Sequence, residues 1–217
     1  MANHIQAVIW DLDGVIIDSG DEHRQAWQRL AREEGVPLSD AQFWATFGQR
    51  NDAIIAQLWG PLPQQQVQEL ADRKESYFRE IIGRTVTALP GSLELMSALQ
   101  AAGYKQGLGS STPIANLNLI SEVLGLDRYL SVLVSGETVP RGKPAPDLFL
   151  KVAEQLGVAP THCLVIEDAV AGVQAAHAAG MRCIAVAGDR DLPGLRAAEL
   201  MVKSLTEVSV ERIRQME

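Results

Sequence analysis

Five short apolar runs recur along the chain, and segments with helical periodicity separate most of them. The runs are IQAVIW, YKQGLG, SVLVSG, CLVIED and CIAVAG, which begin at residues 5, 104, 131, 163 and 183. Strands that are apolar throughout are typical of a parallel sheet whose two faces are both covered by helices. The pattern therefore predicts an α/β fold with a doubly wound, Rossmann-like parallel sheet.

The alternation of strand and helix stops after the first run. Residues 18–86 carry amphipathic helical patterns and no convincing strand. Gly35 and Gly83 follow two of these patterns, and each is predicted to end a helix. Apolar packing inside this segment is expected to use Trp27, Trp44 and Trp59. We therefore predict an inserted helical cap domain at 18–86, and a core domain formed by 1–17 and 87–217.

Polar and charged residues follow the predicted strands where each strand ends. They are Asp11 and Asp13, then Ser110 and Ser111, then Lys143 before a helix, and finally Glu167 and Asp168. In doubly wound sheets ligands bind at the carboxyl ends of the strands. Several carboxylates at one edge would repel one another unless a cation lies among them, and Mg²⁺ prefers oxygen ligands of this kind. Ser110 and Ser111, close to a helix start, suit the oxygens of a phosphate, and Lys143 supplies a charge for the same anion.

In the stretch VIWDLDGV the first two carboxylates stand two residues apart. Alternate residues of an extended strand leave it on the same side, so Asp11 and Asp13 are expected to face one reacting centre. An ionised carboxylate can attack phosphorus, and a second one can exchange protons with the alcohol and with water. Gly14 would allow a sharp turn and the close approach of another group.

Each of these motifs has an ordinary structural explanation when it is taken alone. An aspartate at a strand end often stabilises a turn, and GSST or ED often caps a helix. GKP is common in surface loops. All four motifs nevertheless fall at predicted strand ends in one consistent order, and this combination favours a shared site.

These motifs resemble the four motifs of the haloacid dehalogenase-like superfamily over essentially the whole chain. The resemblance implies that Asp11 is the nucleophile, that Asp13 is the general acid and base, and that Ser110 binds phosphate. It implies that Lys143 is the lysine of the third motif and that Glu167 and Asp168 are the acids of the fourth. Mg²⁺ would be held by Asp11, by the backbone carbonyl of Asp13 and by Asp168, with Glu167 farther from the ion.

The helical insert is similar to the cap of the beta-phosphoglucomutase-like and phosphatase branch of this superfamily. Substrate contacts are predicted for His23, Arg50 and Lys74, although a solvated helix face is the alternative for His23 and Lys74. The stretch DEHRQAW resembles the mutase pattern, whereas the spacing of Gly48 and Arg50 in TFGQRNDAII resembles generic sugar-phosphate phosphatases more closely. The resemblance also implies phosphoryl transfer rather than carbon–halogen cleavage, because the dehalogenases of the superfamily do not keep an aspartate at the position that matches Asp13.

Three functions follow from this resemblance. The first is a Mg²⁺-dependent phosphomonoester phosphatase that acts on a small phosphorylated metabolite, a sugar or polyol phosphate, through an aspartyl-phosphate intermediate. The second is a beta-phosphoglucomutase-like phosphomutase. The third is a non-catalytic protein that binds a phosphorylated metabolite, which would require damage to the catalytic set, and none is visible.

The composition of the chain limits the binding partners and the cellular compartment that we expect for this protein. The net charge of −8 and the isoelectric point near 5.1 argue against nucleic acid as a partner, because phosphate backbones bind clustered Lys and Arg. Without an apolar run of about 20 residues, no membrane span is predicted. We expect a cytoplasmic monomer. Cys163 and Cys183 lie beside apolar runs and are predicted to be buried thiols, with a disulfide between neighbouring strands as the alternative.

Overall fold

The computed structural model describes residues 4–46, 51–190 and 192–216. The chain divides into two compact units, one formed by residues 1–18 and 87–217 and the other by residues 19–86. We call them the sheet unit and the helical unit, and each is described by itself.

Six parallel strands form the single sheet described in the sheet unit. They are β1 (Ala7–Trp10), β2 (Lys105–Ser110), β3 (Val132–Ser135), β4 (Cys163–Glu167), β5 (Arg182–Val186) and β6 (Leu200–Val202). Their order is β3-β2-β1-β4-β5-β6, so the winding direction reverses between β1 and β4. This is the doubly wound order in which a ligand crevice forms at the reversal, so the predicted fold class is confirmed.

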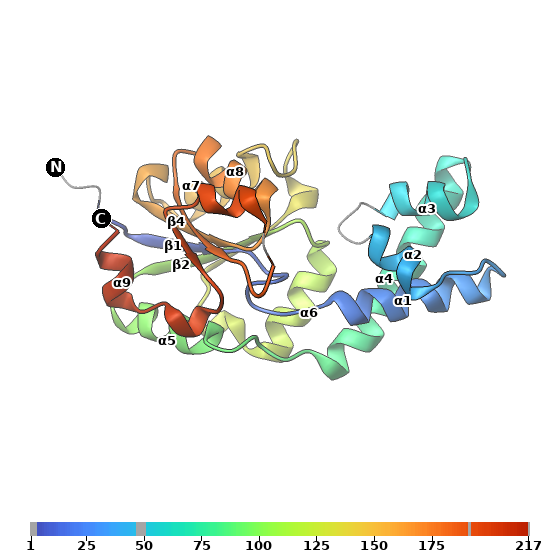
Figure 1. Ribbon diagram of the computed structural model, residues 1–217, viewed down its shortest axis with the longest axis horizontal. Helices are drawn as coiled ribbons and strands as arrows, with labels where there is room; N and C mark the ends of the chain where they lie inside the picture. The colour runs from blue at the N-terminus through green and yellow to red at the C-terminus, as the bar shows by residue number, and fades with distance from the viewer. Residues whose placement is uncertain (1–3, 47–50, 191, 217) are drawn as a thin grey trace. The chain divides into compact units, whose positions relative to one another are not determined.

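Helices cover both faces of this sheet. They are α5 (Ser92–Ala101), α6 (Ile114–Leu124), α7 (Asp147–Leu156), α8 (Val170–Ala178) and α9 (Val210–Arg214). Figure 1 shows α7 and α8 on one face of the sheet, with α5, α6 and α9 on the other. Short 3-10 turns lie at Leu126–Arg128, Gly136–Thr138, Pro160–His162, Pro193–Ala197 and Leu205–Glu207.

The central strands are buried because both of their faces are covered. Every residue of β1 and β4 is buried, which is why these runs are apolar up to Glu167, the last residue of β4. One buried polar link crosses this core: the indole N–H of Trp10 donates to Oε1 of Gln106 at 3.1 Å, and Nε2 of Gln106 donates to the carbonyl of Met96 at 2.9 Å. The link satisfies both ends of the amide and joins β1, β2 and α5.

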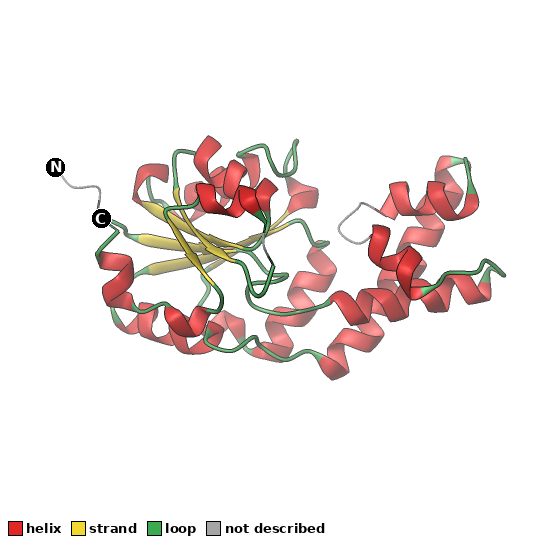
Figure 2. Ribbon diagram, viewed as in Figure 1, coloured by secondary structure: helices red, strands yellow, loops and turns green. Residues whose placement is uncertain are grey.

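The helical unit contains α1 (Gly20–Glu33), α2 (Asp40–Thr46), α3 (Asn51–Trp59) and α4 (Gln64–Thr85), which are drawn with the other helices in Figure 2. Its apolar cluster includes Trp27, and Trp59 packs against the edge of that cluster. The expectation for Trp44 was wrong, because this side chain is exposed and touches the ring of Phe43 from the side.

The two glycines predicted to end helices behave differently. Gly35 adopts a φ of 69° just after α1, as a left-handed cap requires. Gly83 keeps a right-handed backbone, and α4 continues past it to Thr85 before Val86 turns extended. The prediction for Gly83 was therefore wrong.

Three further expectations concern cysteines, membranes and surface charge. Cys163 and Cys183 are buried free thiols, so the disulfide alternative is wrong, and burial raises the pKa of Cys163 to about 11.

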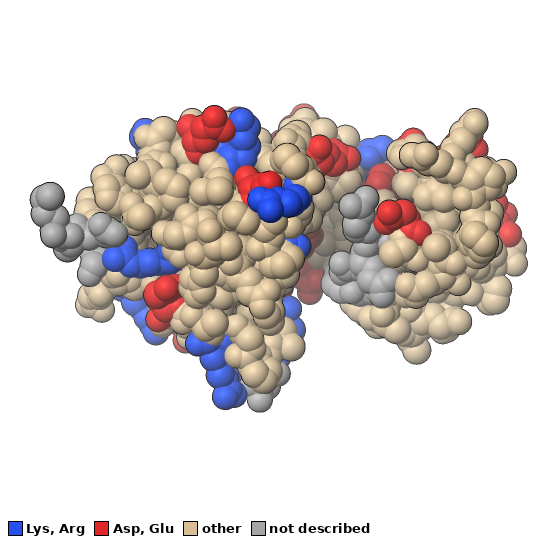
Figure 3. All heavy atoms as spheres, turned by 90° about the horizontal axis from the view of Figure 1, so that it is seen from above, with Lys and Arg blue, Asp and Glu red and all other residues tan. Residues whose placement is uncertain are grey.

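Across the described residues, every helix is too short or too polar to traverse a bilayer. On the face seen in Figure 3, Lys and Arg stand in separate groups among acidic residues and form no continuous basic surface.

Candidate active site

Asp11 directly follows β1 at the point where the sheet reverses its winding. Its backbone N–H donates to the carbonyl of Ile166 at 3.0 Å, which continues the pairing of β1 with β4 beyond the last strand residue. The side chain is buried, and its Oδ1 accepts a hydrogen bond from Nζ of Lys143 at 2.6 Å. The sheet therefore brings two residues together that lie 132 positions apart.

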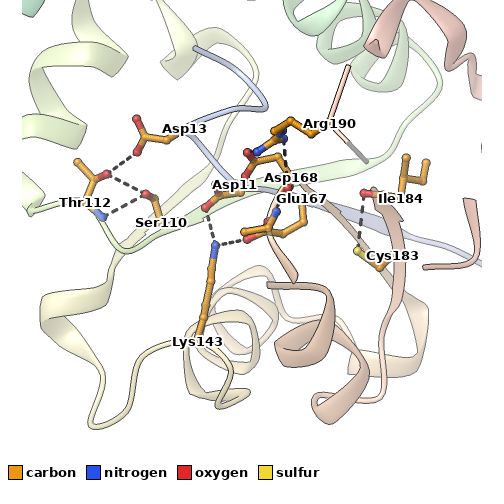
Figure 4. A network of polar contacts seen from close by, with 11 residues as sticks. Asp11, Asp13, Ser110, Thr112, Lys143, Glu167, Asp168, Cys183, Ile184 and Arg190 are labelled. Atoms are coloured by element: carbon orange, nitrogen blue, oxygen red, sulfur yellow. Dashed lines mark hydrogen bonds and ion pairs between the residues drawn. The ribbon is translucent and has the colours of Figure 1, made fainter. Parts of the chain in front are cut away.

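Lys143 lies between two carboxylates. Its Nζ contacts Oδ1 of Asp11 at 2.6 Å and Oε1 of Glu167 at 2.5 Å, and it lies 4.9 Å from the ring centre of Phe149 (Figure 4). Burial opposes the charge on the ammonium, but the two carboxylates outweigh burial and raise the pKa of Lys143. Lys143 is therefore a fixed cation at the end of β1.

Glu167 ends β4, and both of its carboxylate oxygens are engaged. Oε2 accepts the backbone N–H groups of Asp168 and Ala169 at 2.6 Å each, while Oε1 accepts from Lys143. A Cβ placed on Gly172 would lie 1.8 Å from Oε1, so the carboxylate rests against that glycine at the start of α8. Glu167 thus holds Lys143 in place and is itself held by backbone.

Asp168 follows Glu167 and lies beside Gly14, where a Cβ would come within 2.0 Å of Oδ2 of Asp168. The close approach that was expected at Gly14 is therefore an approach of this carboxylate, and the φ of 78° at Gly14 also requires glycine. Nη2 of Arg190 lies 3.0 Å from the same oxygen. Burial and then the charge of Glu167 raise the pKa of Asp168 to about 6, whereas Arg190 opposes the rise.

Three of these carboxylates could hold a metal ion. One oxygen each from Asp11, Glu167 and Asp168 lies within 4.8 Å of the others, the only such group among the described residues. Burial raises the pKa of Asp11 well above its usual value, against the opposing charge of Lys143, and Glu167 raises it further. A hard divalent cation would reverse this penalty, so the donor set and its electrostatics fit Mg²⁺.

Asp13 belongs to a second set of contacts at the same edge. Its Oδ2 accepts the hydroxyl of Thr112 at 2.8 Å, and the hydroxyl of Ser110 donates to Oγ1 of Thr112 at 3.0 Å. Figure 4 shows Asp13 directed toward Thr112 while Asp11 meets Lys143. The two aspartates therefore meet different partners, because the chain leaves the extended conformation after Asp11 and turns at Gly14. Metal binding by the backbone carbonyl of Asp13 stays a prediction.

The model of the haloacid dehalogenase-like hydrolases matches residues 5–180. This chain belongs to the haloacid dehalogenase-like hydrolase family. It is 32% identical over 212 residues to the chloroplastic 5-amino-6-(5-phospho-D-ribitylamino)uracil phosphatase of Arabidopsis thaliana, a match that covers 96% of this chain and 57% of that one.

Two further relatives resemble this haloacid dehalogenase-like hydrolase over nearly their whole length. Hexitol phosphatase A of Escherichia coli is 32% identical over 204 residues, which cover 94% of this chain and 93% of that one. The crystal structure of beta-phosphoglucomutase from Clostridium difficile is 27% identical and aligns with a TM-score of 0.84, covering 98% of this chain and 96% of that chain.

Substrate contact by His23, Arg50 and Lys74 stays a prediction, but the structure shows the surroundings of two of these residues. Nζ of Lys74 lies 2.8 Å from Nδ1 of His23 and 2.8 Å from Oε1 of Glu75, and the lysine is buried. A solvated helix face is therefore excluded for Lys74. The ring of His23 stacks on Phe78 with centroids 4.0 Å apart. Burial, followed by the charge of Lys74, lowers the pKa of His23 to about 3. Arg50 lies outside the described residues.

Two residues of the site have no role predicted from the sequence. Thr112 lies in the GSST motif, next to the two serines that are predicted to bind phosphate. Of those serines, Ser110 is buried within the Thr112 contacts, and Ser111 is exposed in the following bend. Arg190 lies in a loop after β5, and no motif in the chain pointed to it.

Proposed function

We propose that this haloacid dehalogenase-like hydrolase is a Mg²⁺-dependent phosphatase. Its substrate would be a small phosphorylated sugar or polyol, and the reaction would pass through an aspartyl phosphate on Asp11. The observation that supports this most directly is the setting of Asp11, a buried carboxylate with a fixed lysine at 2.6 Å and two further carboxylates within metal-binding reach. A buried carboxylate with a raised pKa beside a fixed charge is typical of a functional site, and it supports Asp11 as the nucleophile.

The first half of the reaction transfers the phosphoryl group to the protein. A carboxylate oxygen of Asp11 forms a bond to phosphorus as the bond from phosphorus to the alcohol oxygen breaks. Asp13, protonated at this stage, gives its proton to the departing alkoxide. Lys143 keeps Asp11 oriented and offsets the charge of the phosphoryl oxygens. Bound Mg²⁺ would be held by Asp11 and Asp168, and would supply further positive charge.

The second half releases inorganic phosphate. Water attacks phosphorus, Asp13 accepts its proton, and the bond between phosphorus and Asp11 breaks, which restores the free carboxylate. The hydroxyl chain from Ser110 through Thr112 fixes the carboxylate of Asp13 during both proton transfers. Ser110, Ser111 and Lys143 are proposed as the phosphate ligands.

The relatives support a sugar or polyol phosphate as the substrate class. One is named for a phosphoribityl compound and another for hexitols. We propose that the helical unit acts as a cap that selects among such substrates, as the resemblance to capped members of the family implies.

Replacement of Asp11 by Asn tests the proposal. The variant removes the nucleophilic oxygen and keeps nearly the same shape, so phosphate release from a panel of hexose, pentose and polyol phosphates should fall to background. The wild type should hydrolyse at least one member of the panel, and only when Mg²⁺ is present. Asp189→Asn serves as the control, because Asp189 is an exposed acid whose side-chain contact is to Lys203. Substantial hydrolysis by Asp11→Asn would exclude the covalent role.

A phosphomutase is the second candidate. The 2.8 Å contact between His23 and Lys74 supports it, because the resemblance to the mutase branch rests on these two residues. The similarity to the Clostridium difficile mutase structure supports it as well. Incubation with a hexose 1-phosphate separates the candidates: a mutase yields the 6-phosphate, and a phosphatase yields only free sugar and inorganic phosphate.

A further inference from the structure

Arg190 links the ends of two neighbouring strands. It lies in the loop after β5, and its Nε donates to the carbonyl of Ala187 at 3.1 Å. Its Nη2 donates to the carbonyl of Val186 at 3.2 Å and to the backbone carbonyl of Asp168 at 3.2 Å. Three main-chain acceptors thus fix the planar guanidinium in one orientation.

The same nitrogen also contacts the side chain of Asp168. Nη2 of Arg190 lies 3.0 Å from Oδ2, which is the oxygen that faces Gly14. Oδ2 is therefore confined on one side by a backbone without a side chain and on the other by a fixed cation. The arrangement orients the whole carboxylate through one of its two oxygens.

A cation in this place has two opposite effects on a metal held by Asp168. Its charge repels the metal and weakens binding, whereas its ion pair with Oδ2 orients the ligand and strengthens binding. The guanidinium is half exposed, with 47% of the side chain accessible, so water screens the repulsion. Its hydrogen bonds to main-chain carbonyls, which fix the guanidinium, are weakened less by water than the repulsion is. We therefore expect the orienting effect on metal affinity to be larger than the repulsive effect.

We propose that Arg190 is a positioning residue that holds Asp168 ready for the metal ion. The inference rests on the proposed Mg²⁺-dependent function and deepens it, because it makes the loop after β5 part of the metal site. Partners that orient a metal ligand typically contribute ten- to a hundredfold to metal affinity. Loss of Arg190 should weaken binding by roughly this factor, and a lysine should restore only part of it because it lacks the planar fork.

Metal affinity measured without substrate tests this role. Mn²⁺ serves as the probe in place of Mg²⁺, with the free ion counted by electron paramagnetic resonance during titration of the full-length chain. The variants are Arg190→Met and Arg190→Lys. The control is Lys203→Met, which removes an exposed cation that contacts Asp189 in the same loop and makes no contact with Asp168. Thermal melting monitors folding, and Arg190→Lys decides the question if Arg190→Met does not fold.

Weaker binding in both Arg190 variants, with wild-type binding in Lys203→Met, supports the proposal. Unchanged or tighter binding in a folded Arg190 variant overturns it, because the guanidinium would then act only as a competing charge. A wild type that binds no Mn²⁺ would instead overturn the metal assignment itself, and this inference with it. The failure of the two proposals is therefore distinguishable.

Discussion

Gly172 lies inside α8, where a glycine normally weakens the helix. Replacing such a glycine by alanine usually stabilises a protein by about 0.5–1 kcal/mol. Here the added Cβ would meet the carboxylate of Glu167 at 1.8 Å, and Glu167 cannot retreat because Asp168 and Ala169 hold it from the other side. We expect Gly172→Ala to displace Glu167 and, through it, Lys143. The variant should lose most of its phosphatase activity and gain no stability, as measured by kcat and by chemical denaturation.

Two further variants isolate this steric cause. Gln174→Ala places alanine at an exposed position of the same helix and should leave kcat unchanged. Glu167→Asp shortens the side chain by one methylene, so adding it to Gly172→Ala should recover part of the activity that Gly172→Ala alone has lost. If Gly172→Ala keeps wild-type kcat, the contact between this glycine and the carboxylate of Glu167 does not affect catalysis.

Single residues of the site differ in how far the sequence could predict them. Asp11 and Asp168 follow the ends of apolar strands and Lys143 precedes a helix, in a recognisable order, and the topology of the sheet then brings them together. Arg190 has no such signal, because it acts through main-chain carbonyls whose positions exist only in the folded loop. Thr112 lay within a motif, but its contact with Asp13 depends on a turn that the periodicity of the chain does not encode.

The boundaries of helices and strands are also only partly predictable from the sequence, because some of them depend on the folded structure. β6 has only three residues, Leu200–Val202, too few for a period of two to be visible. Gly83 looked like a helix end because glycine is common there, but a glycine ends a helix only when its backbone turns left-handed. That choice depends on tertiary packing, which lets α4 continue to Thr85.

The pairing of α1 with α4 makes the helical unit sensitive to acid. His23 on α1 accepts from Lys74 on α4, and its pKa falls from 6.5 to about 3 on folding. Between these two values the unfolded chain binds more protons than the folded one, so stability decreases as the pH falls. From pH 7 to pH 5 we expect a loss on the order of 1–2 kcal/mol from this histidine.

Denaturant unfolding at the two pH values measures this loss. Asp168, whose pKa is raised to about 6, also titrates in this interval. The wild type is therefore compared with His23→Asn, which keeps an acceptor near Lys74 but does not titrate. The variant should lose less stability than the wild type over the same interval. Equal losses in the two proteins would show that His23 does not remain neutral in the folded state.

For the molecule as a whole, the sheet unit concentrates unfavourable charge in a chain that is already acidic. The net charge is −8, and three carboxylates converge within reach of one ion. Asp168 has its pKa raised to about 6, so at pH 7 its ionised form opposes folding. The site therefore lowers the stability of the metal-free protein, and metal binding should restore it.

Because a metal ion would relieve the repulsion among these carboxylates, the stability of the whole protein should depend on magnesium. A ligand present at 100 times its Kd stabilises the folded state by about 2.7 kcal/mol, so Mg²⁺ should raise the free energy of unfolding by this amount and a chelator should reverse the gain. Asp168→Asn should be at least as stable as the wild type without metal, because it removes a partly buried charge whose pKa is raised. It should also gain little when Mg²⁺ is added. Chemical denaturation of both proteins at matched ionic strength, with and without Mg²⁺, measures the four values. If Mg²⁺ stabilises the two proteins equally, the ion acts elsewhere on the surface and not through the carboxylates at the ends of β1 and β4.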